Sequence, residues 1–241
     1  DIRRARRAYF ANISYLDDKI GEVLTALDGT RQVENTVILF VSDHGDMLGE
    51  RGLWFKMSFF EGSARVPLMV ATPESQPDMQ PGLIADPVST IDVCPTLCDL
   101  AGVDMEDVMP WVTGESLVPL GQGAARLSPV AMEYAAEGSY SPLVALRAGP
   151  WKYTNCALDP EQLFDLDADH HERVNLAEAS EHRPVLERFR MEAAARWDLE
   201  RFDAEVRESQ ARRWVVYEAL RQGGYYPWDY QPLQKASERY M

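Results

Sequence analysis

Hydrophobic residues recur every three or four positions over residues 3–28, which predicts an amphipathic helix. The polar turn Asp28-Gly29-Thr30 is expected to end this helix. A continuous run of β-branched and apolar residues follows at 36–41 and predicts a short strand buried on both faces, as in a parallel sheet. A second strand is expected at 65–71. A helix, a loop and a buried strand in this order indicate an α/β unit.

The pattern changes further along the chain. Residues 91–102 predict a short helix, in which Pro95 is tolerated only within the first turn, and 103–129 are expected to form a surface connection. Four short runs with turns between them then predict a small antiparallel sheet. These runs are 130–134, 143–147, 151–154 and 162–166. Helical periodicity returns over 181–222, and the final residues, 225–241, are so rich in Tyr and Trp that they are expected to pack on another surface.

Composition narrows the classes of function. With 46% hydrophobic and 26% charged residues, the chain of 241 residues can bury a sizeable core. A net charge of -15 argues against nucleic acid and against an anionic membrane surface as partners, and it is compatible with a cationic substrate or simply with an acidic enzyme. No apolar run reaches the ~18 residues of a membrane helix. The three cysteines show no disulfide spacing, so we expect a reducing, cytoplasmic location.

The loop after the first predicted strand carries the candidate chemistry. Asp43 is a hard oxygen donor suited to Ca²⁺ or Mg²⁺, and His44 can add a nitrogen to a metal or a hydrogen bond to an anionic oxygen. Lys56 is a long cation that can return to the same place and meet a charged ester oxygen. A metal and an ammonium group around one tetrahedral anion suit sulfuryl or phosphoryl transfer. Asp-His-Gly alone is common, however, and often only forms a turn.

The longer segment 41–56 resembles the second metal-ligand motif of the type I sulfatases, within the alkaline phosphatase superfamily. By this resemblance Asp43 and His44 are metal ligands and Lys56 contacts the sulfate group, while His44 either completes the metal site or supports departure of the leaving group. Segments 92–102 and 162–176 are also similar to sulfatase segments. The resemblance implies an α/β, alkaline-phosphatase-like sandwich. It also implies a divalent metal, usually Ca²⁺, with Mn²⁺ or Mg²⁺ as alternatives.

The end of the chain, at 213–217 and 226–241, looks like the C-terminal extension of choline sulfatases, which hydrolyse choline-O-sulfate to choline and sulfate. Glu133 matches the position where these enzymes place an acidic residue near the trimethylammonium group. A surface or salt-bridged Glu133 is an equally open interpretation. The resemblance implies a homo-oligomer in which the tail crosses to a neighbour, and packing on its own subunit is the alternative.

Sulfatases attack with a formylglycine made from Cys or Ser in a Cys/Ser-x-Pro/Ala-x-Arg motif, and we expect this chain to lack that motif. The chain also starts inside a charged helical stretch without Met. We therefore expect a C-terminal half that is inactive alone, with the formylglycine in the N-terminal half. Three parts are expected: the catalytic α/β domain over 1–125, a small antiparallel sheet over 126–180, and helices with the aromatic tail over 181–241. The alternatives are a phosphonate monoester or phosphodiester hydrolase of the same superfamily, or a noncatalytic oligomerisation module.

Three further pairs of residues have simpler interpretations. Cys94 and Cys98 are expected to be small buried side chains rather than a metal pair. His170 and His171 are expected to form a solvated turn. Arg147 and Lys152 are expected to be strand-edge charges that limit aggregation.

Overall fold

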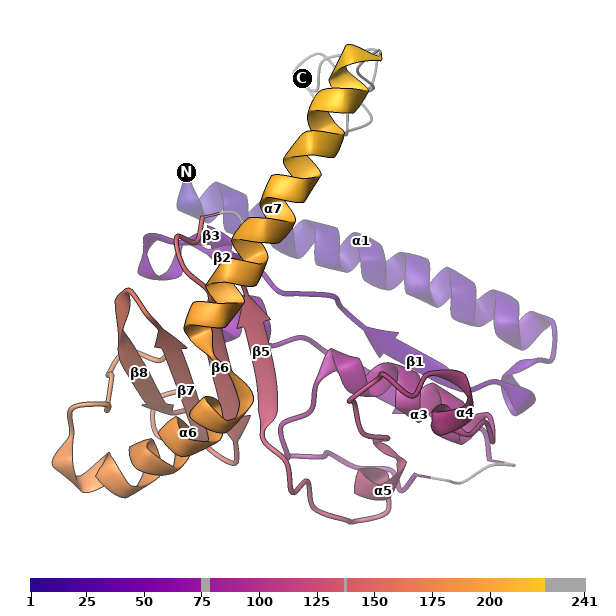
Figure 1. Ribbon diagram of the computed structural model, residues 1–241. Coiled ribbons are helices and arrows are strands. Elements are labelled where there is room, and N and C mark those ends of the chain that lie inside the picture. The colour runs from indigo at the N-terminus through magenta and orange to yellow at the C-terminus, as the bar shows by residue number, and fades with distance from the viewer. Residues whose placement is uncertain (75–78, 137, 224–241) are drawn as a thin grey trace. The chain divides into compact units, whose positions relative to one another are not determined.

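The computed structural model describes residues 1–74, 79–136 and 138–223. The chain divides into two compact units, Asp1–Arg196 and Trp197–Met241. The first unit contains a long N-terminal helix, a two-stranded sheet, a hairpin and a four-stranded sheet (Figure 1). Short elements connect them: the 3₁₀ helices η1 (Val33–Asn35), η2 (Glu50–Gly52), η3 (Thr90–Asp92) and η4 (Ser180–His182), and the one-turn helices α4 (Met105–Val108) and α5 (Val118–Gly121). No helix within the described ranges is long and apolar enough to cross a membrane.

The predicted N-terminal helix is confirmed as α1 (Ile2–Gly29). None of its residues is fully buried, and its apolar positions Ile13, Leu16 and Val23 are largely exposed. Its first turns contact the hairpin that follows β1, because Arg6 donates to the Leu48 carbonyl at 3.0 Å and pairs with Glu50 at 2.7 Å. The helix is therefore tied to the candidate site loop at one end.

The predicted strands at 36–41 and 65–71 are confirmed as β1 (Ile38–Val41) and β4 (Leu68–Ala71), which pair with each other in antiparallel fashion. The parallel-sheet environment expected for β1 is corrected here, since its four residues are only half-buried. The physical reason lies between the strands. A parallel pair requires a long crossover connection, whereas 42–67 folds into a hairpin and one helical turn that bring the chain straight back.

The hairpin consists of β2 (Met47–Leu48) and β3 (Trp54–Phe55), and it is followed by the helical turn α2 (Glu61–Ala64). Together these elements carry the chain from the end of β1 past Asp43 and His44 to Lys56 and back. They form the scaffold of the candidate site.

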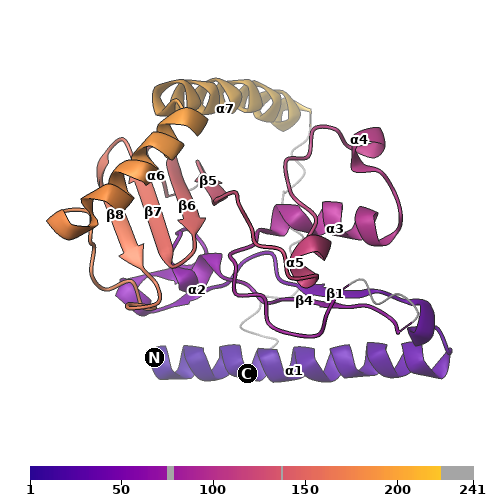
Figure 2. The same cartoon turned by 90° about the horizontal axis from the view of Figure 1, so that it is seen from below.

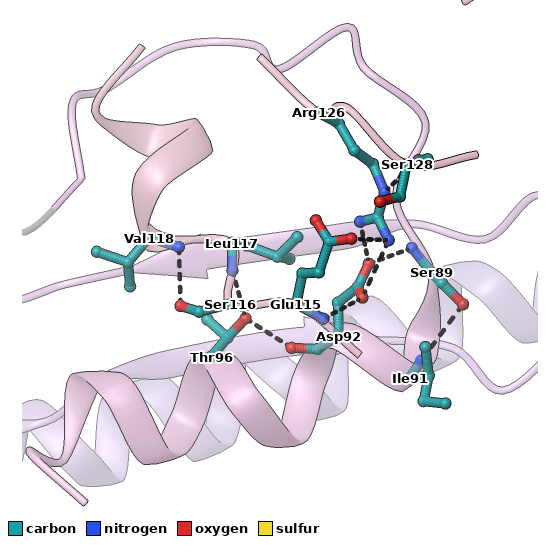
Figure 3. Close-up of polar contacts among 10 residues, drawn as sticks. All are labelled: Ser89, Ile91, Asp92, Thr96, Glu115, Ser116, Leu117, Val118, Arg126 and Ser128. Atoms are coloured by element: carbon teal, nitrogen blue, oxygen red, sulfur yellow. Dashed lines mark hydrogen bonds and ion pairs between the residues drawn. The ribbon is translucent and has the colours of Figure 1, made fainter. Parts of the chain in front are cut away.

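The predicted helix at 91–102 is confirmed as α3 (Val93–Leu100), with Pro95 in its first turn and Gly102 in the left-handed region at φ +68°. The fully buried Asp92 precedes it and accepts from the backbone N–H groups of Ser89 and Glu115, at 2.8 and 2.9 Å. Arg126 pairs with the same carboxylate at 2.6 Å (Figure 3). The expected surface connection after α3 is thus fastened to the helix start by a buried charge pair.

The antiparallel sheet is confirmed, in the order β5 (Val130–Tyr134), β6 (Leu143–Ala148), β7 (Trp151–Cys156) and β8 (Asp159–Asp165). Helix α6 (Arg183–Arg196) covers one face, where Tyr153 stacks on Phe189 with ring centroids 6.0 Å apart. Figure 2 shows α2 on the opposite side of the sheet from α6. Lys152 binds the Phe59 carbonyl and the Glu61 carboxylate on that side, so residues 59–61 lie against the opposite face. The sheet is therefore the core of the first unit, with the candidate site loop packed on one side.

The second unit contains α7 (Leu199–Gln222), which begins at the capping residue Asp198. Its surface carries ion pairs between acidic and basic residues one turn apart, such as Arg201 with Glu205 and Arg207 with Asp203. Trp214, Val215 and Val216 are exposed on the same helix. The expected aromatic tail at 225–241 lies outside the described residues.

Candidate active site

Asp43 and His44 lie at the end of β1, and their side chains turn towards each other. The distance from Asp43 Oδ2 to His44 Nε2 is 3.5 Å. The Asp43 side chain is 84% exposed, so its carboxylate is open to a ligand. The Ser42 hydroxyl donates to the His44 carbonyl at 2.9 Å, which fixes the loop between them.

The His44 ring has its tautomer set by a backbone group. Its Nδ1 lies 2.9 Å from the Gly45 carbonyl oxygen, which can only accept, so Nδ1 carries the proton. The Nε2 lone pair is then available next to the Asp43 carboxylate. A metal-binding histidine commonly donates its other ring N–H to a carbonyl in this way. The pair is thus arranged as two adjacent donors for one cation.

The electrostatics of Asp43 agree with this arrangement. A hydrogen bond from the His44 backbone N–H, at 2.9 Å, holds the pKa of the Asp43 carboxyl below its usual range, and the charge of Lys56 lowers this pKa further. The Asp43 carboxyl therefore stays ionised in mildly acidic solution.

Lys56 follows directly after a strained position in the hairpin. Phe55 has φ +66°, and Arg51 in the same hairpin has φ +54°. Such left-handed backbone at a bulky residue costs of order 1–3 kcal/mol and persists where surrounding structure enforces it. Lys56, which comes directly after this position, is exposed.

The two parts of the site approach each other through backbone contacts. The Gly45 N–H donates to the Ser63 carbonyl at 2.8 Å, and a Cβ added at Gly45 would lie 2.3 Å from the Gly62 carbonyl oxygen. Gly45 is thus required by close approach of the α2 turn. The Ser63 hydroxyl in turn donates to the Lys56 carbonyl at 2.6 Å. The segment holding Asp43 and His44 and the segment holding Lys56 are joined through one buried serine.

Behind the α2 turn lies a buried charge cluster that sequence reasoning missed. Lys152 is 1% exposed and donates to the Phe59 carbonyl at 2.7 Å and to Glu61 at 2.8 Å. The interpretation of Lys152 as a strand-edge charge was wrong, because β7 is an interior strand of the sheet. Arg147 likewise lies on the interior strand β6. His170 and His171 do lie exposed in a turn, as expected.

Glu133 is exposed on the edge strand β5. It pairs in register with Val144, on the sheet face that α6 covers, whereas Lys152 and residues 59–61 lie on the opposite face. The structure therefore links the segment of Asp43 and His44 to the backbone of Lys56 through Ser63, and it does not bring Glu133 to them.

A cavity of about 220 Å³ lies on the same face of the four-stranded sheet as Lys152. Its walls include Met57, Ser58, Phe59, Tyr134 and Leu143. The Ser58 hydroxyl is buried and has no hydrogen-bond partner among the described residues. Three of its lining residues, 57–59, follow Lys56 in the sequence, and the lining is polar and apolar in similar measure.

Whether a metal ion could bind at the candidate site depends on the ligand atoms that the chain supplies there. Among residues 1–74, 79–136 and 138–223, no group of three or more His, Cys, Asp or Glu side chains converges on one point. Asp43 and His44 supply two donors of types that Ca²⁺ or Mn²⁺ accepts. These two donors fit a divalent metal ion but supply only part of the ligands that such an ion requires.

One expectation about the nucleophile needs correction in detail. The chain has no Cys-x-Pro-x-Arg segment, but a looser Ser-x-Ala-x-Arg pattern occurs at Ser209–Arg213. This segment lies inside α7, where Arg212 pairs with Glu208. Since α7 belongs to the second unit, nothing places Ser209 beside Lys56, and we assign it no role.

Comparisons with known proteins agree along the chain. Residues 2–103 match the family model "Sulfatase", and residues 204–241 match "Choline sulfatase enzyme C terminal". The chain is 66% identical over its whole length to a choline-sulfatase of Rhizobium meliloti, of which it covers 47%. It is 37% identical over 73% of its length to arylsulfatase K of Danio rerio, of which it covers 34%. The chain thus spans less than half the length of these curated relatives.

Solved structures confirm the fold class. A 2-O GAG sulfatase superposes on 82% of this chain with a TM-score of 0.64 and 27% identity, and 42% of that structure is covered. A phosphonate monoester hydrolase of Agrobacterium radiobacter superposes on 75% of the chain with a TM-score of 0.62 and 25% identity, with 38% of it covered. The α/β, alkaline-phosphatase-like architecture inferred from sequence is therefore correct. The two family models and the whole-chain identity agree: residues 2–103 carry a sulfatase domain, and residues 204–241 carry a C-terminal segment of the choline sulfatase type.

Proposed function

We propose that the protein containing this chain is a sulfuric ester hydrolase and that its substrate is choline-O-sulfate. The observation that carries the proposal is the joining of Asp43, His44 and Lys56 at one loop by the Gly45–Ser63 and Ser63–Lys56 hydrogen bonds. The 66% identity to a choline-sulfatase supports the choice of substrate.

In this proposal the residues of the chain have distinct tasks. Asp43 and His44 hold a divalent ion, with Ca²⁺ as the family's usual choice, and such an ion neutralises charge on a sulfuryl oxygen when bound. Lys56 binds a second sulfuryl oxygen through its ammonium group, which remains positively charged throughout the reaction. His44, with its proton held on Nδ1 by Gly45, presents only Nε2 to the site. The nucleophile is expected to be a formylglycine, which this chain is not proposed to supply.

The choline part of the substrate carries a quaternary ammonium group, for which Glu133 is the proposed partner by resemblance. Its position on the face opposite to residues 59–61 makes this the assignment with the least support from geometry. Glu133→Gln in the full-length enzyme tests it. A raised KM for choline-O-sulfate with little change in kcat is expected, and an unchanged KM rejects the assignment.

A phosphonate monoester or phosphodiester hydrolase is the second candidate, favoured by the similarity to the Agrobacterium enzyme. The deciding experiment assays the full-length protein with choline-O-sulfate, a phosphonate monoester and a phosphodiester under one set of conditions. We expect the highest kcat/KM for the sulfate ester. A preference for either phosphorus ester overturns the proposal. Purified alone, the 241-residue chain is expected to turn over none of them.

We further propose a cytoplasmic homo-oligomer in which the aromatic tail contributes to the interface. The exposed Trp214, Val215 and Val216 on α7, which precedes this tail in the sequence, support an additional contact surface. Deletion of residues 225–241 tests the tail, with molecular mass measured by light scattering. A smaller assembly is expected, and an unchanged mass indicates that the tail packs on its own subunit.

A further inference from the structure

Ser63 makes three hydrogen bonds, and two of them connect the segment of Asp43 and His44 with the segment of Lys56. Its hydroxyl donates to the Lys56 carbonyl at 2.6 Å, and its own carbonyl accepts from the Gly45 N–H at 2.8 Å. Its N–H donates to the Phe60 carbonyl at 2.9 Å. The residue is 2% exposed, so solvent does not compete for these bonds.

The turn that carries Ser63 is itself held firmly. Lys152 binds the Phe59 carbonyl and the Glu61 carboxylate, and Glu172 accepts from the Glu61 N–H at 2.8 Å. Ser63 therefore sits on a segment fixed to the central sheet. The hydrogen bond from its hydroxyl holds the backbone of Lys56, seven residues earlier in the chain, against this fixed segment.

The Lys56 backbone needs such a support. It follows the strained Phe55, and its side chain is exposed, so no packing fixes it from the outside. Its carbonyl accepts two hydrogen bonds, from the Ser63 hydroxyl and from the Ser58 N–H at 2.8 Å. Of these, only the bond from Ser63 links Lys56 to the segment that also binds Gly45.

We propose that Ser63 is a positioning residue, which sets the place of the Lys56 ammonium group relative to Asp43 and His44 for the hydrolysis of a sulfate ester. This inference rests on the proposed function. Ser63 touches neither substrate nor metal, and it acts only through Lys56 and Gly45. A misplacement of about 1 Å in a group that binds the reacting atoms can lower a rate roughly a hundredfold.

The test uses Ser63→Ala in the full-length enzyme with choline-O-sulfate. This change removes the hydroxyl and keeps the backbone bond to Gly45, and the Ser58 N–H still satisfies the Lys56 carbonyl. We expect kcat/KM to fall about tenfold or more. The melting temperature should change by only about 2–4 °C. Thr96→Val is the matched control, because Thr96 is a fully buried hydroxyl that also donates to a carbonyl at 2.6 Å, on α3. It should lower the melting temperature at least as much and leave kcat/KM within about twofold of wild type.

A double-mutant cycle separates positioning from a general loss of structure. In a Lys56→Ala background, Ser63→Ala should change kcat/KM by less than about twofold, because the group it positions is gone. Full additivity of the two losses overturns the inference, as does a Ser63→Ala enzyme with unchanged kcat/KM. If the wild-type protein hydrolyses no sulfate ester at all, the proposed function has failed instead.

Discussion

The ammonium nitrogen of Lys152 lies 2.5 Å from Glu172 Oε1, and both side chains are at least 97% buried. The contact is a close ion pair rather than a well-aligned hydrogen bond. Glu172 also has φ +56°, so the backbone there is held in a left-handed conformation. This pair anchors the turn that precedes Ser63 and thereby the candidate site.

Removal of Lys152 should destabilise the first unit strongly. Lys152→Ala leaves the Glu61 and Glu172 carboxylates without their shared cation, and breaking a buried pair in this way costs about 3–5 kcal/mol. Urea unfolding followed by circular dichroism measures the change. Lys19→Ala is the control, because Lys19 pairs with Glu22 on the exposed surface of α1 and such a pair contributes at most about 1 kcal/mol. Equal effects of the two substitutions would contradict the anchoring role.

Much of the fold was readable from local pattern, since local pattern decides whether a segment is helix or strand. The residues of α1, α3 and β5 follow from spacing of apolar positions, from the tolerated place of Pro95 and from the turn at Gly102. The Lys152–Glu172 pair could not be predicted from the sequence. The residues around a lysine in a strand do not indicate whether that strand lies inside the sheet or at its edge. The partner of β1 was also missed, since an apolar run specifies burial and does not specify strand direction.

Gly45 should tolerate no side chain. A Cβ there would lie 2.3 Å from the Gly62 carbonyl oxygen, and both are backbone groups that cannot rotate away. Gly45→Ala is therefore expected to lower stability by about 1–3 kcal/mol, typical of overpacking, and to displace Asp43 and His44.

The control is Gly21→Ala, in the interior of α1, where nothing lies within 4 Å of the added atom. Helix propensity predicts a gain there of about 0.5–1 kcal/mol. Thermal melting of the two variants gives the comparison. A Gly45→Ala protein as stable as wild type would mean that the α2 turn does not approach the site loop so closely.

The Glu161–Arg190 pair should make the free energy of unfolding depend on pH in the acidic range. Hydrogen bonds from Arg190 lower the pKa of the Glu161 carboxyl, and Tyr153, whose own pKa is raised by burial, donates to the same carboxyl at 3.0 Å. A lowered folded-state pKa gives stability that is present above the ordinary value of 4.5 and is lost as the pH falls through the folded-state value.

Glu161→Gln should therefore unfold at lower urea concentration than wild type at pH 7, and this difference should shrink as the pH falls below 4.5. Urea titrations at a series of pH values measure it. A difference that stays constant from neutral to acid pH would show that the charge of Glu161 is not involved.

Asp43 should be needed for metal retention. Asp43→Asn in the full-length protein keeps the size of the side chain and removes its charge, so the metal content after gel filtration should fall well below that of wild type. Elemental analysis by mass spectrometry provides the readout. Asp17→Asn, at an exposed position on α1, is the control and should retain wild-type content. Equal metal content in both variants would remove Asp43 from the ligand set.

The candidate site itself was predictable only in part. Asp43, His44 and Lys56 could be singled out as candidates because they lie in one short segment with a family pattern. Ser63 was not predicted, because its proposed role depends on a hydrogen bond to a backbone carbonyl. Every residue has such a carbonyl, so the sequence does not indicate which one is bound. Glu133 shows the opposite case: a family position was identified, but strand register places it on the other face of the sheet from residues 59–61.

The most direct measurement is kcat/KM for choline-O-sulfate of full-length Lys56→Ala, beside wild type and Lys19→Ala. Loss of a group that stabilises charge in the transition state should lower kcat/KM by roughly 10²–10³-fold, with the melting temperature unchanged and Lys19→Ala equal to wild type. A Lys56→Ala enzyme that retains wild-type kcat/KM would show that the Lys56 ammonium group does not bind the sulfate.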